Sequence, residues 1–233
     1  MKKIICILLA AIMTCSLVAC GNGQQNNKNT GTNESSKSFE TTDNNIANKD
    51  TQIASAKAAY QDLNATSIAC ETIIKSIYGA WYFSIYEEDK YLEFSPALAA
   101  FSNKTGLNKS VISTAVEKYI EDSNGVLEKT DITRLAVLCG SSSAIKIVIS
   151  AYAEVYSNAS ACLESAKENI KCLTSEYSDV TGYATLKTYY SEVLSYLEFC
   201  KSPSGSFKQL GTTIDNYQTN CSKYQNDLSL IFE

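Results

Sequence analysis

The chain has no histidine, a single arginine (Arg134) and only two prolines among its 233 residues. The missing histidine excludes Ser-His-Asp and Cys-His catalysis, histidine-ligated zinc and the Glu-x-x-His di-iron site of helical bundles. A Ser-Lys or carboxylate mechanism would still be possible, but no motif for either stands out. We therefore predict a protein that is not an enzyme and that needs no cofactor.

Basic residues are few and scattered. The chain has 20 of them against 25 acidic residues, a net charge of −5. Binding to nucleic acid or electrostatic docking on anionic lipid would need a basic cluster, which the sequence does not contain. We expect no nucleic-acid partner.

The first twenty residues have the pattern of a targeting segment. Lys2 and Lys3 precede a short apolar run over 4–13, which is too short to span a membrane alone. The run leads into Leu17-Val18-Ala19-Cys20, followed by Gly21. This order of a basic start, an apolar run and small residues predicts cleavage near residue 20.

The Leu17-Val18-Ala19-Cys20 motif resembles the lipobox of the bacterial lipoproteins. The resemblance implies cleavage before Cys20 and a thioether-linked diacylglycerol on this cysteine. The protein would then be held on the outer side of the cell membrane. Two acyl chains anchor it firmly, because each buried methylene adds about 0.8 kcal/mol to the free energy of membrane binding. An ordinary secretory signal that ends in cysteine is the alternative. Without Lys2 and Lys3, the mature chain has 18 basic and 25 acidic residues, a net charge of −7.

Three segments follow from composition. Residues 1–19 form the predicted signal peptide. Residues 20–45 are rich in Asn, Gln, Ser, Thr and Gly and predict a flexible tether, because such a composition cannot bury enough apolar surface to offset its ordering entropy. Residues 46–233 are long enough for one good-sized core and form the predicted folded domain.

Apolar residues recur in alternating steps of three and four over four segments of the predicted domain. This seven-residue rhythm is typical of helices that coil around one another. We therefore predict an all-α protein, an elongated antiparallel helical bundle of four long coiled-coil-like helices with a short helical insertion at about 96–121. The positions that define the rhythm are Ile53, Ala56, Tyr60, Leu63, Ser67, Cys70, Ile74, Ile77 and Trp81; Leu135, Leu138, Ser142, Ile145, Ile149, Tyr152, Tyr156, Ala159, Leu163, Ala166, Ile170, Leu173 and Tyr177; Tyr183, Leu186, Tyr190, Val193, Leu197 and Cys200; and Phe207, Leu210, Ile214, Tyr217, Cys221, Tyr224, Leu228 and Ile231.

The predicted helices have the following limits. The first starts between Asp43 and Asp50 and ends near Tyr86. The second is one long helix over 131–177, in which 140–143 (Gly-Ser-Ser-Ser) marks a close helix approach or a mild kink. The third and fourth begin near Tyr183 and Phe207.

Six cysteines remain outside the predicted signal peptide and its cleavage site: Cys70, Cys139, Cys162, Cys172, Cys200 and Cys221. An even number outside the cytoplasm can indicate disulfides. Three of the six fall in the apolar rows of three different helices, where a free cysteine acts as a small hydrophobic residue. We expect mostly free thiols, with a cross-helix bridge as the alternative.

An aromatic cluster over 78–94 is the best candidate binding site. Tyrosine and tryptophan offer a large amphipathic contact area at low entropy cost. The candidate surface residues are Trp81, Tyr82, Tyr86 and Tyr91. Alternatively, Trp81 and the nearby phenylalanines Phe83, Phe94 and Phe101 plug one end of the bundle.

A weak calcium-loop candidate spans 120–131. In the spacing of an EF-hand it places Asp122 at position 3, Asn124 at position 5 and Asp131 at position 12. Ile120 stands where a carboxylate belongs, and Asp131 is shorter than the usual bidentate glutamate. A plain turn is the stronger interpretation, so we predict no metal site.

These observations favour a membrane-anchored lipoprotein that faces outside the cytoplasm and has a non-catalytic bundle. Its predicted partners are the membrane, through the lipid on Cys20, and an unidentified envelope or surface protein. The alternative is a sensory bundle that binds a small molecule in an aromatic pocket near Trp81.

Overall fold

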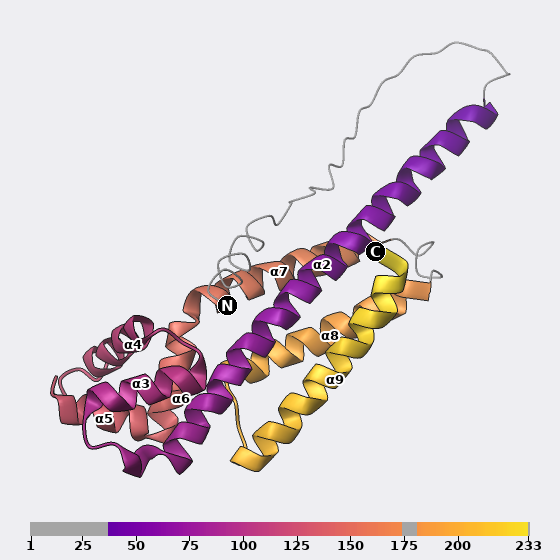
Figure 1. Ribbon diagram of the computed structural model, residues 1–233. Coiled ribbons are helices and arrows are strands. Elements are labelled where there is room, and N and C mark those ends of the chain that lie inside the picture. Colours follow the sequence, from indigo (N-terminus) through magenta and orange to yellow (C-terminus); the bar gives the residue numbers. More distant parts are fainter. Residues whose placement is uncertain (1–36, 174–180, 233) are drawn as a thin grey trace. The chain divides into compact units, whose positions relative to one another are not determined.

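A computed structural model describes residues 37–173 and 181–232, and side chains over 49–173 and 182–232 (Figure 1). Over these residues the protein has eight α-helices, one 3-10 helix and no strand, which confirms the predicted all-α class. The lipobox at 17–20 lies outside the described residues. The elements are α2 (Lys37–Tyr86), η1 (Glu88–Lys90), α3 (Phe94–Thr105), α4 (Lys109–Glu121), α5 (Asp131–Cys139), α6 (Ser141–Ala151), α7 (Ala153–Lys171), α8 (Thr181–Lys201) and α9 (Phe207–Phe232).

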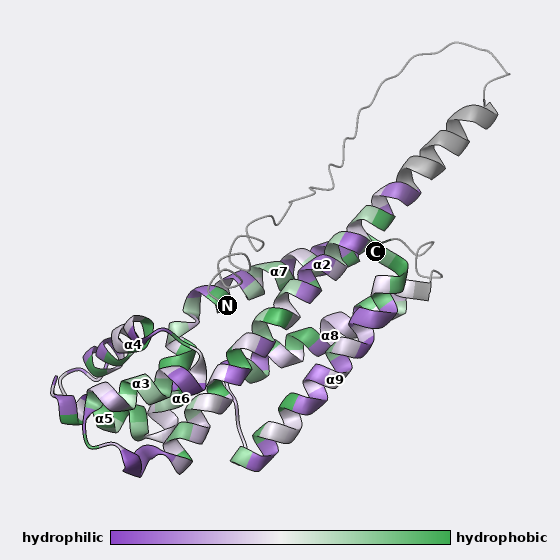
Figure 2. Ribbon diagram, in the orientation of Figure 1, coloured by the Kyte–Doolittle hydropathy of each residue, from purple (hydrophilic) through white to green (hydrophobic). Residues whose placement is uncertain are grey.

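Two compact units make up the chain. Of the described residues, unit 1 contains 37–65, 161–173, 181–191 and 223–232, and unit 2 contains 66–160 and 192–222. Helices α2, α7, α8 and α9 each contribute residues to both units. In each of these helices polar and apolar residues are interspersed (Figure 2), as expected for helices with one buried face.

Unit 1 is held together by a polar network inside an apolar core. The Tyr189 hydroxyl of α8 donates to Asn64 Oδ1 of α2 at 3.0 Å and accepts from Gln225 Nε2 of α9 at 3.0 Å. Tyr60 donates to the Gln225 carbonyl oxygen at 3.3 Å. A polar group that is removed from water needs another hydrogen-bond partner. The bonds among these side chains supply such partners inside the core. The surrounding fully or nearly fully buried side chains are Ala56, Ala59, Leu63, Leu186 and Leu228.

The helices of unit 2 that belong to the bundle pack antiparallel, as predicted. Tyr196 of α8 stacks on Tyr217 of α9 with centroids 4.7 Å apart. Along the α2–α9 pair, Gln218 contacts Glu71, while Phe207 contacts Tyr78, so residue numbers fall on one helix as they rise on the other.

Helices α3, α4, α5 and α6 form the rest of unit 2 (Figure 1). Their fully buried side chains include Phe101, Ile112, Val116, Leu138 and Ile147. Helices α5 and α6 pack against α3 and α4, so the helical insertion predicted at about 96–121 continues beyond residue 121.

The predicted single helix over 131–177 is wrong, because it is broken at Gly140 and at Tyr152. Helices α5 and α6 meet at 92°, which is much more than a mild kink. Gly140 is extended (φ −74°, ψ 122°), and its N–H still bonds to Ala136 while its carbonyl accepts from Ala144. The same residue thus ends one helix and starts the next. The Ser143 hydroxyl donates to the Gly140 carbonyl at 2.9 Å and supports the turn.

The start of α2 also differs from the expectation. The helix begins at Lys37, so residues 37–45 of the predicted tether are helical. Within the described part of the chain, no single helix is long and apolar enough to cross a membrane; α5 and α6 reach that length only as a bent pair.

The six described cysteines are not joined by disulfides in this structure. Cys70, Cys162, Cys200 and Cys221 are buried, while Cys139 and Cys172 are half-buried.

Candidate functional site

Five aromatic rings of unit 2 gather where the end of α2 meets the start of α9. Phe207, the first residue of α9, is their common neighbour. Its ring centroid lies 4.6 Å from Tyr78, 6.3 Å from Trp81, 6.3 Å from Tyr82 and 5.8 Å from Tyr86. We refer to these five residues as the aromatic surface.

The aromatic surface is open to solvent. Tyr78 is 37% exposed and Tyr86 is 54% exposed, while Trp81, Tyr82 and Phe207 are half-buried. Large apolar side chains that serve only as part of a core are usually buried, with far less exposed surface than these rings have. A cluster that stays exposed therefore offers contact area to a partner.

The polar atoms of these rings are available as well. Among the described residues, the hydroxyls of Tyr78, Tyr82 and Tyr86 form no hydrogen bond within the protein. A tyrosine hydroxyl can both donate and accept, so each one can pair with a partner's backbone, amide or hydroxyl group.

A charged pair lies beside the aromatic surface. Lys104 Nζ lies 4.6 Å from the Tyr82 ring centroid and 2.8 Å from Glu87 Oε1. The hydrogen bond to Glu87 raises the pKa of Lys104. The ammonium group therefore stays charged and contributes a cation–π contact to the Tyr82 ring.

The four predicted surface residues do not form one group. Tyr91 stacks on Phe83 with centroids 5.8 Å apart, and Phe83 packs edge-on against Phe101 at 5.4 Å. Phe83 and Phe101 are fully buried. The predicted plug thus describes Phe83 and Phe101, with Tyr91 against them, whereas Trp81, Tyr82 and Tyr86 lie on the aromatic surface.

Sequence reasoning missed the role of Phe207, because it assigned this residue to the apolar row of the last helix. The signal available was the break at 202–205, which places an aromatic residue directly at a helix start. Only the antiparallel pairing of α2 with α9 brings Phe207 to Tyr78.

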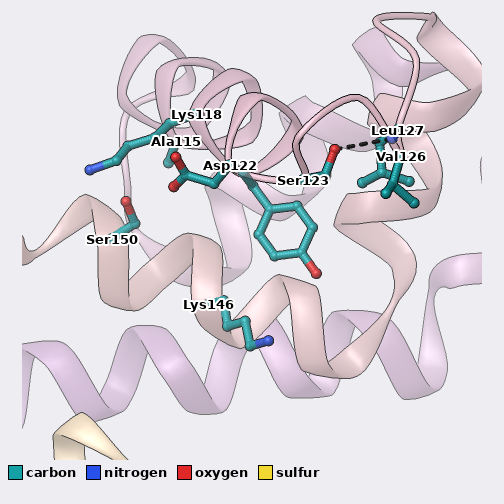
Figure 3. A pocket seen from close by; sticks show the side chains of 9 residues that line it. Ala115, Lys118, Asp122, Ser123, Val126, Leu127, Lys146 and Ser150 are labelled. Atoms are coloured by element: carbon teal, nitrogen blue, oxygen red, sulfur yellow. Dashed lines mark hydrogen bonds between the residues drawn. The ribbon is translucent and has the colours of Figure 1, made fainter.

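A separate pocket of about 640 Å³ lies between α4, α6 and the turn after α4 (Figure 3). Figure 3 shows Lys118 and Asp122 on the α4 side and Lys146 and Ser150 on α6. The remaining lining residues are Ala115, Tyr119, Ser123, Val126 and Leu127. Neither lysine forms an ion pair among the described residues, so two cations border a partly apolar hollow.

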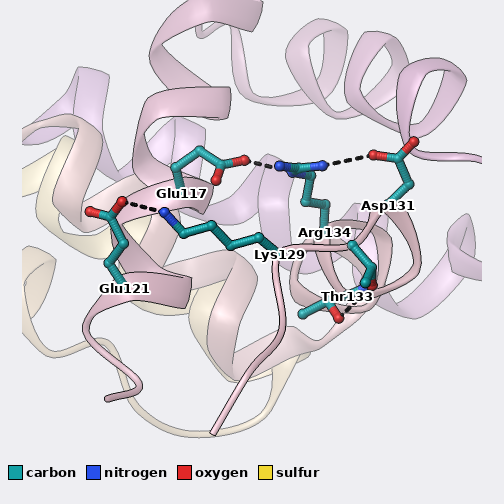
Figure 4. Close-up of polar contacts among 7 residues, drawn as sticks. Glu117, Glu121, Lys129, Asp131, Thr133 and Arg134 are labelled. Carbon is teal, nitrogen blue, oxygen red and sulfur yellow. Dashed lines mark hydrogen bonds and ion pairs between the residues drawn. The ribbon is translucent and has the colours of Figure 1, made fainter. Parts of the chain in front are cut away.

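The calcium-loop candidate has other contacts (Figure 4). Arg134 binds the Asp131 carboxylate at 2.9 Å and Glu117 at 2.6 Å, and Lys129 binds Glu121 at 2.7 Å. This lysine lowers the pKa of Glu121 through a hydrogen bond. In this structure the Asp131 carboxylate, which the spacing places at position 12, is paired with Arg134.

The turn itself accounts for the sequence pattern. Asn124 and Gly125 adopt the left-handed backbone conformation, with φ of 54° and 84°. The Ser123 hydroxyl accepts a hydrogen bond from the Leu127 N–H at 3.0 Å. Asparagine and glycine are the residues that adopt this conformation most readily.

Over residues 37–173 and 181–232, no three cysteine or carboxylate side chains are close enough together to hold a metal ion. The chain matches no protein-family model, no curated protein and no solved structure.

Proposed function

We propose that the protein is a membrane-anchored extracytoplasmic lipoprotein with a non-catalytic helical domain. The Leu17-Val18-Ala19-Cys20 motif supports the anchor. The domain binds another protein or a cell-envelope component through the aromatic surface. The observation that carries this proposal is the gathering of Tyr78, Trp81, Tyr82 and Tyr86 around Phe207. Within the described part of the chain, the three tyrosine hydroxyls of this group have no hydrogen-bond partner.

Energetics favour this surface over the rest of the described exterior. Tyrosine and tryptophan are enriched among the residues that contribute most to protein interfaces. Phe207 holds the neighbouring rings in place, so binding costs less side-chain entropy than it would for separate exposed rings. The nearby Lys104–Glu87 pair adds a polar edge, as is usual around an apolar contact.

Labelling with an alkyne analogue of palmitate tests the anchor. The full chain expressed in a bacterium takes up the label, and Cys20→Ser loses it. Cys172→Ser, which changes a half-buried cysteine far from the motif, serves as the control and keeps the label. Equal labelling of Cys20→Ser and the parent chain contradicts the anchor.

Site-specific photo-crosslinking tests the surface. A benzophenone amino acid at Tyr86 is compared with the same amino acid at Leu194, an exposed apolar residue on α8 in the same unit. The proposal predicts a discrete envelope adduct from position 86 and none from position 194. The same adducts from both positions, or none from either, contradict it.

The pocket between α4 and α6 supports a second candidate, the binding of a small molecule. It differs in place from the expected pocket near Trp81. Its volume of about 640 Å³ suits a metabolite, and Lys118 and Lys146 favour a carboxylate or phosphate group. A thermal-shift panel of sugar acids and sugar phosphates tests this candidate. Stabilisation that disappears in Lys118→Gln/Lys146→Gln but persists in Lys201→Gln supports it, and no response from any compound rejects it.

A further inference from the structure

Two thiols from helices far apart in sequence meet in the core of unit 2. The Cys200 thiol of α8 donates a hydrogen bond to the Cys70 carbonyl oxygen of α2 at 3.5 Å. The Cys70 side chain is near enough to contribute, after burial, to the raised pKa of the Cys200 thiol. Both residues have no exposed surface. The two side chains therefore point into the same space from two helices.

The surroundings hold this contact in place. The Tyr156 hydroxyl donates to the Cys200 carbonyl oxygen at 2.7 Å, which ties α7 to the same turn of α8. The Tyr196 ring, one turn earlier on α8, stacks on Tyr217 and is 1% exposed. Because the interior is close-packed, the backbones on either side of the thiols have little room to move apart.

We propose that Cys70 and Cys200 are a redox pair that forms a disulfide between α2 and α8 when the chain folds in the presence of a small-molecule or protein disulfide. The bond closes a loop of 130 residues. A cross-link over such a long loop restricts the unfolded chain and stabilises the folded one. This inference is independent of the aromatic surface.

The reaction is a thiol–disulfide exchange in two steps. One cysteine thiolate attacks a sulfur of the external disulfide, forms a mixed disulfide and releases one thiolate. The second cysteine thiolate then attacks the protein sulfur of the mixed disulfide and releases the other thiolate. Two protein thiols are oxidised, one external disulfide is reduced to two thiols, and the two protons pass to solvent and to the released thiolates.

Burial decides when this exchange takes place. Desolvation raises the pKa of the Cys200 thiol, so in the folded unit the reactive thiolate is scarce and no reagent reaches it. The bond therefore forms while the helices are still open, and the folded unit afterwards protects it from reduction.

Cys221 of α9 is the competing partner, since it is 3% exposed and lies in the same core. Burial raises the pKa of its thiol to about 11, and the Ser67 side chain beside it lowers that pKa in part. The proposed pair leaves Cys221 reduced.

The chain is well suited to a mapping experiment, because trypsin places each of the six cysteines on a separate peptide. Cys70 falls in 58–75, Cys200 in 188–201 and Cys221 in 209–223. The full chain carrying Cys6→Ser, Cys15→Ser and Cys20→Ser is refolded from urea with oxidised glutathione, or treated with it only after folding. Free thiols are then alkylated, and the linked peptides are identified by mass spectrometry without reductant.

The proposal predicts that refolding links 58–75 to 188–201, that treatment after folding leaves the Cys70 and Cys200 thiols free to be alkylated in urea, and that the linked chain melts at a higher temperature than the reduced chain. Cys221→Ser keeps the link, whereas Cys200→Ser loses it. A main product that links 188–201 to 209–223, or complete alkylation after refolding, overturns the proposal. The peptide map of the parent chain decides between these results even if a variant fails to fold.

Discussion

The Phe207 ring stacks on the Tyr78 ring with their centroids 4.6 Å apart and an angle of 29° between their planes. This contact joins the first residue of α9 to the last third of α2. The same phenylalanine also contacts Trp81, Tyr82 and Tyr86, so a single side chain organises the aromatic surface. Aromatic pairs of this kind contribute about 0.5–1.5 kcal/mol beyond the area that they bury.

Phe207→Ala tests how much this ring contributes to the stability of the fold. We expect the free energy of unfolding to fall by about 2 kcal/mol, less than for a fully buried phenylalanine, because Phe207 is half-buried. Urea unfolding followed by circular dichroism measures the loss. Lys208→Ala, next in sequence and exposed, is the control and should change stability by no more than about 0.5 kcal/mol. Equal effects of the two substitutions would show that the ring contacts contribute nothing.

Two glycines of unit 2 give opposite predictions. A Cβ at Gly79 would lie 2.1 Å from the Lys104 carbonyl oxygen, a backbone atom that cannot turn away. Gly79→Ala should therefore separate α2 from α3 and lower the free energy of unfolding by about 1–3 kcal/mol or more. A Cβ at Gly211 meets only a Tyr78 ring carbon at 3.8 Å. Gly211→Ala should raise stability by up to about 1 kcal/mol, because alanine favours the helix. Thermal melts of both variants check this, and a reversed order contradicts the α2–α3 packing.

Two buried tyrosines differ in how their hydroxyls are bonded. Tyr156 donates to the Cys200 carbonyl at 2.7 Å, whereas the Tyr196 hydroxyl is buried with no hydrogen-bond partner among the described residues. Tyr156→Phe should lower the free energy of unfolding by about 1–2 kcal/mol, because it leaves a buried carbonyl with fewer partners. Tyr196→Phe should be neutral or slightly stabilising. Denaturant titration compares the two, and a larger loss at Tyr196 would indicate an unseen partner there.

Asp62 of unit 1 makes stability depend on pH. Burial raises the pKa of its carboxyl group, and a hydrogen bond with Ser165 opposes this only in part. A carboxyl that binds its proton more tightly in the folded state loses stability as the pH rises from the unfolded-state pKa to the folded-state pKa. Asp62→Asn removes this loss.

The variant should match the parent at low pH and become progressively more stable than the parent above the ordinary carboxyl range. Melting curves from acid to neutral pH measure the difference. A difference that is constant over the whole range would contradict the raised pKa.

The helical class and most helix limits could be predicted from the sequence, because a seven-residue apolar rhythm has few structural solutions. The predicted rows of the first and last helices contain buried residues such as Leu63, Ile77, Leu210 and Leu228. On α7, Tyr156, Ala159 and Leu163 are also buried, as the rhythm requires.

The seven-residue rhythm predicted the wrong buried face for α6. Ser142 is exposed and Ile145 is only half-buried, whereas Ala144, Ile147 and Val148 are buried. The breaks at Gly140 and Tyr152 change the direction of the chain, so the buried face of α6 no longer continues the row of α7. A row of apolar residues carries no information on such a bend, since isoleucine occurs on several faces of this segment.

The aromatic site could be predicted only in part. Composition placed it at the end of the first helix, where Trp81, Tyr82 and Tyr86 do lie on one surface. Tyr91 lies against the buried Phe83 instead of on the aromatic surface, because the chain turns at η1 between the two residues. The role of Phe207 depends on a tertiary contact, which local sequence cannot specify.

The most direct test of the proposed function compares Tyr82→Ser/Tyr86→Ser with Ile68→Ser/Leu194→Ser, a pair of exposed apolar residues in the same unit. Both are made in the full chain with Cys20→Ser, so that lipid does not contribute to binding. Cosedimentation with isolated cell envelopes is measured beside the melting temperature. The account predicts that the tyrosine variant loses cosedimentation and melts within a few degrees of the parent, while the control variant still binds. Retained cosedimentation of the tyrosine variant, or a collapse of its melting temperature, would contradict it.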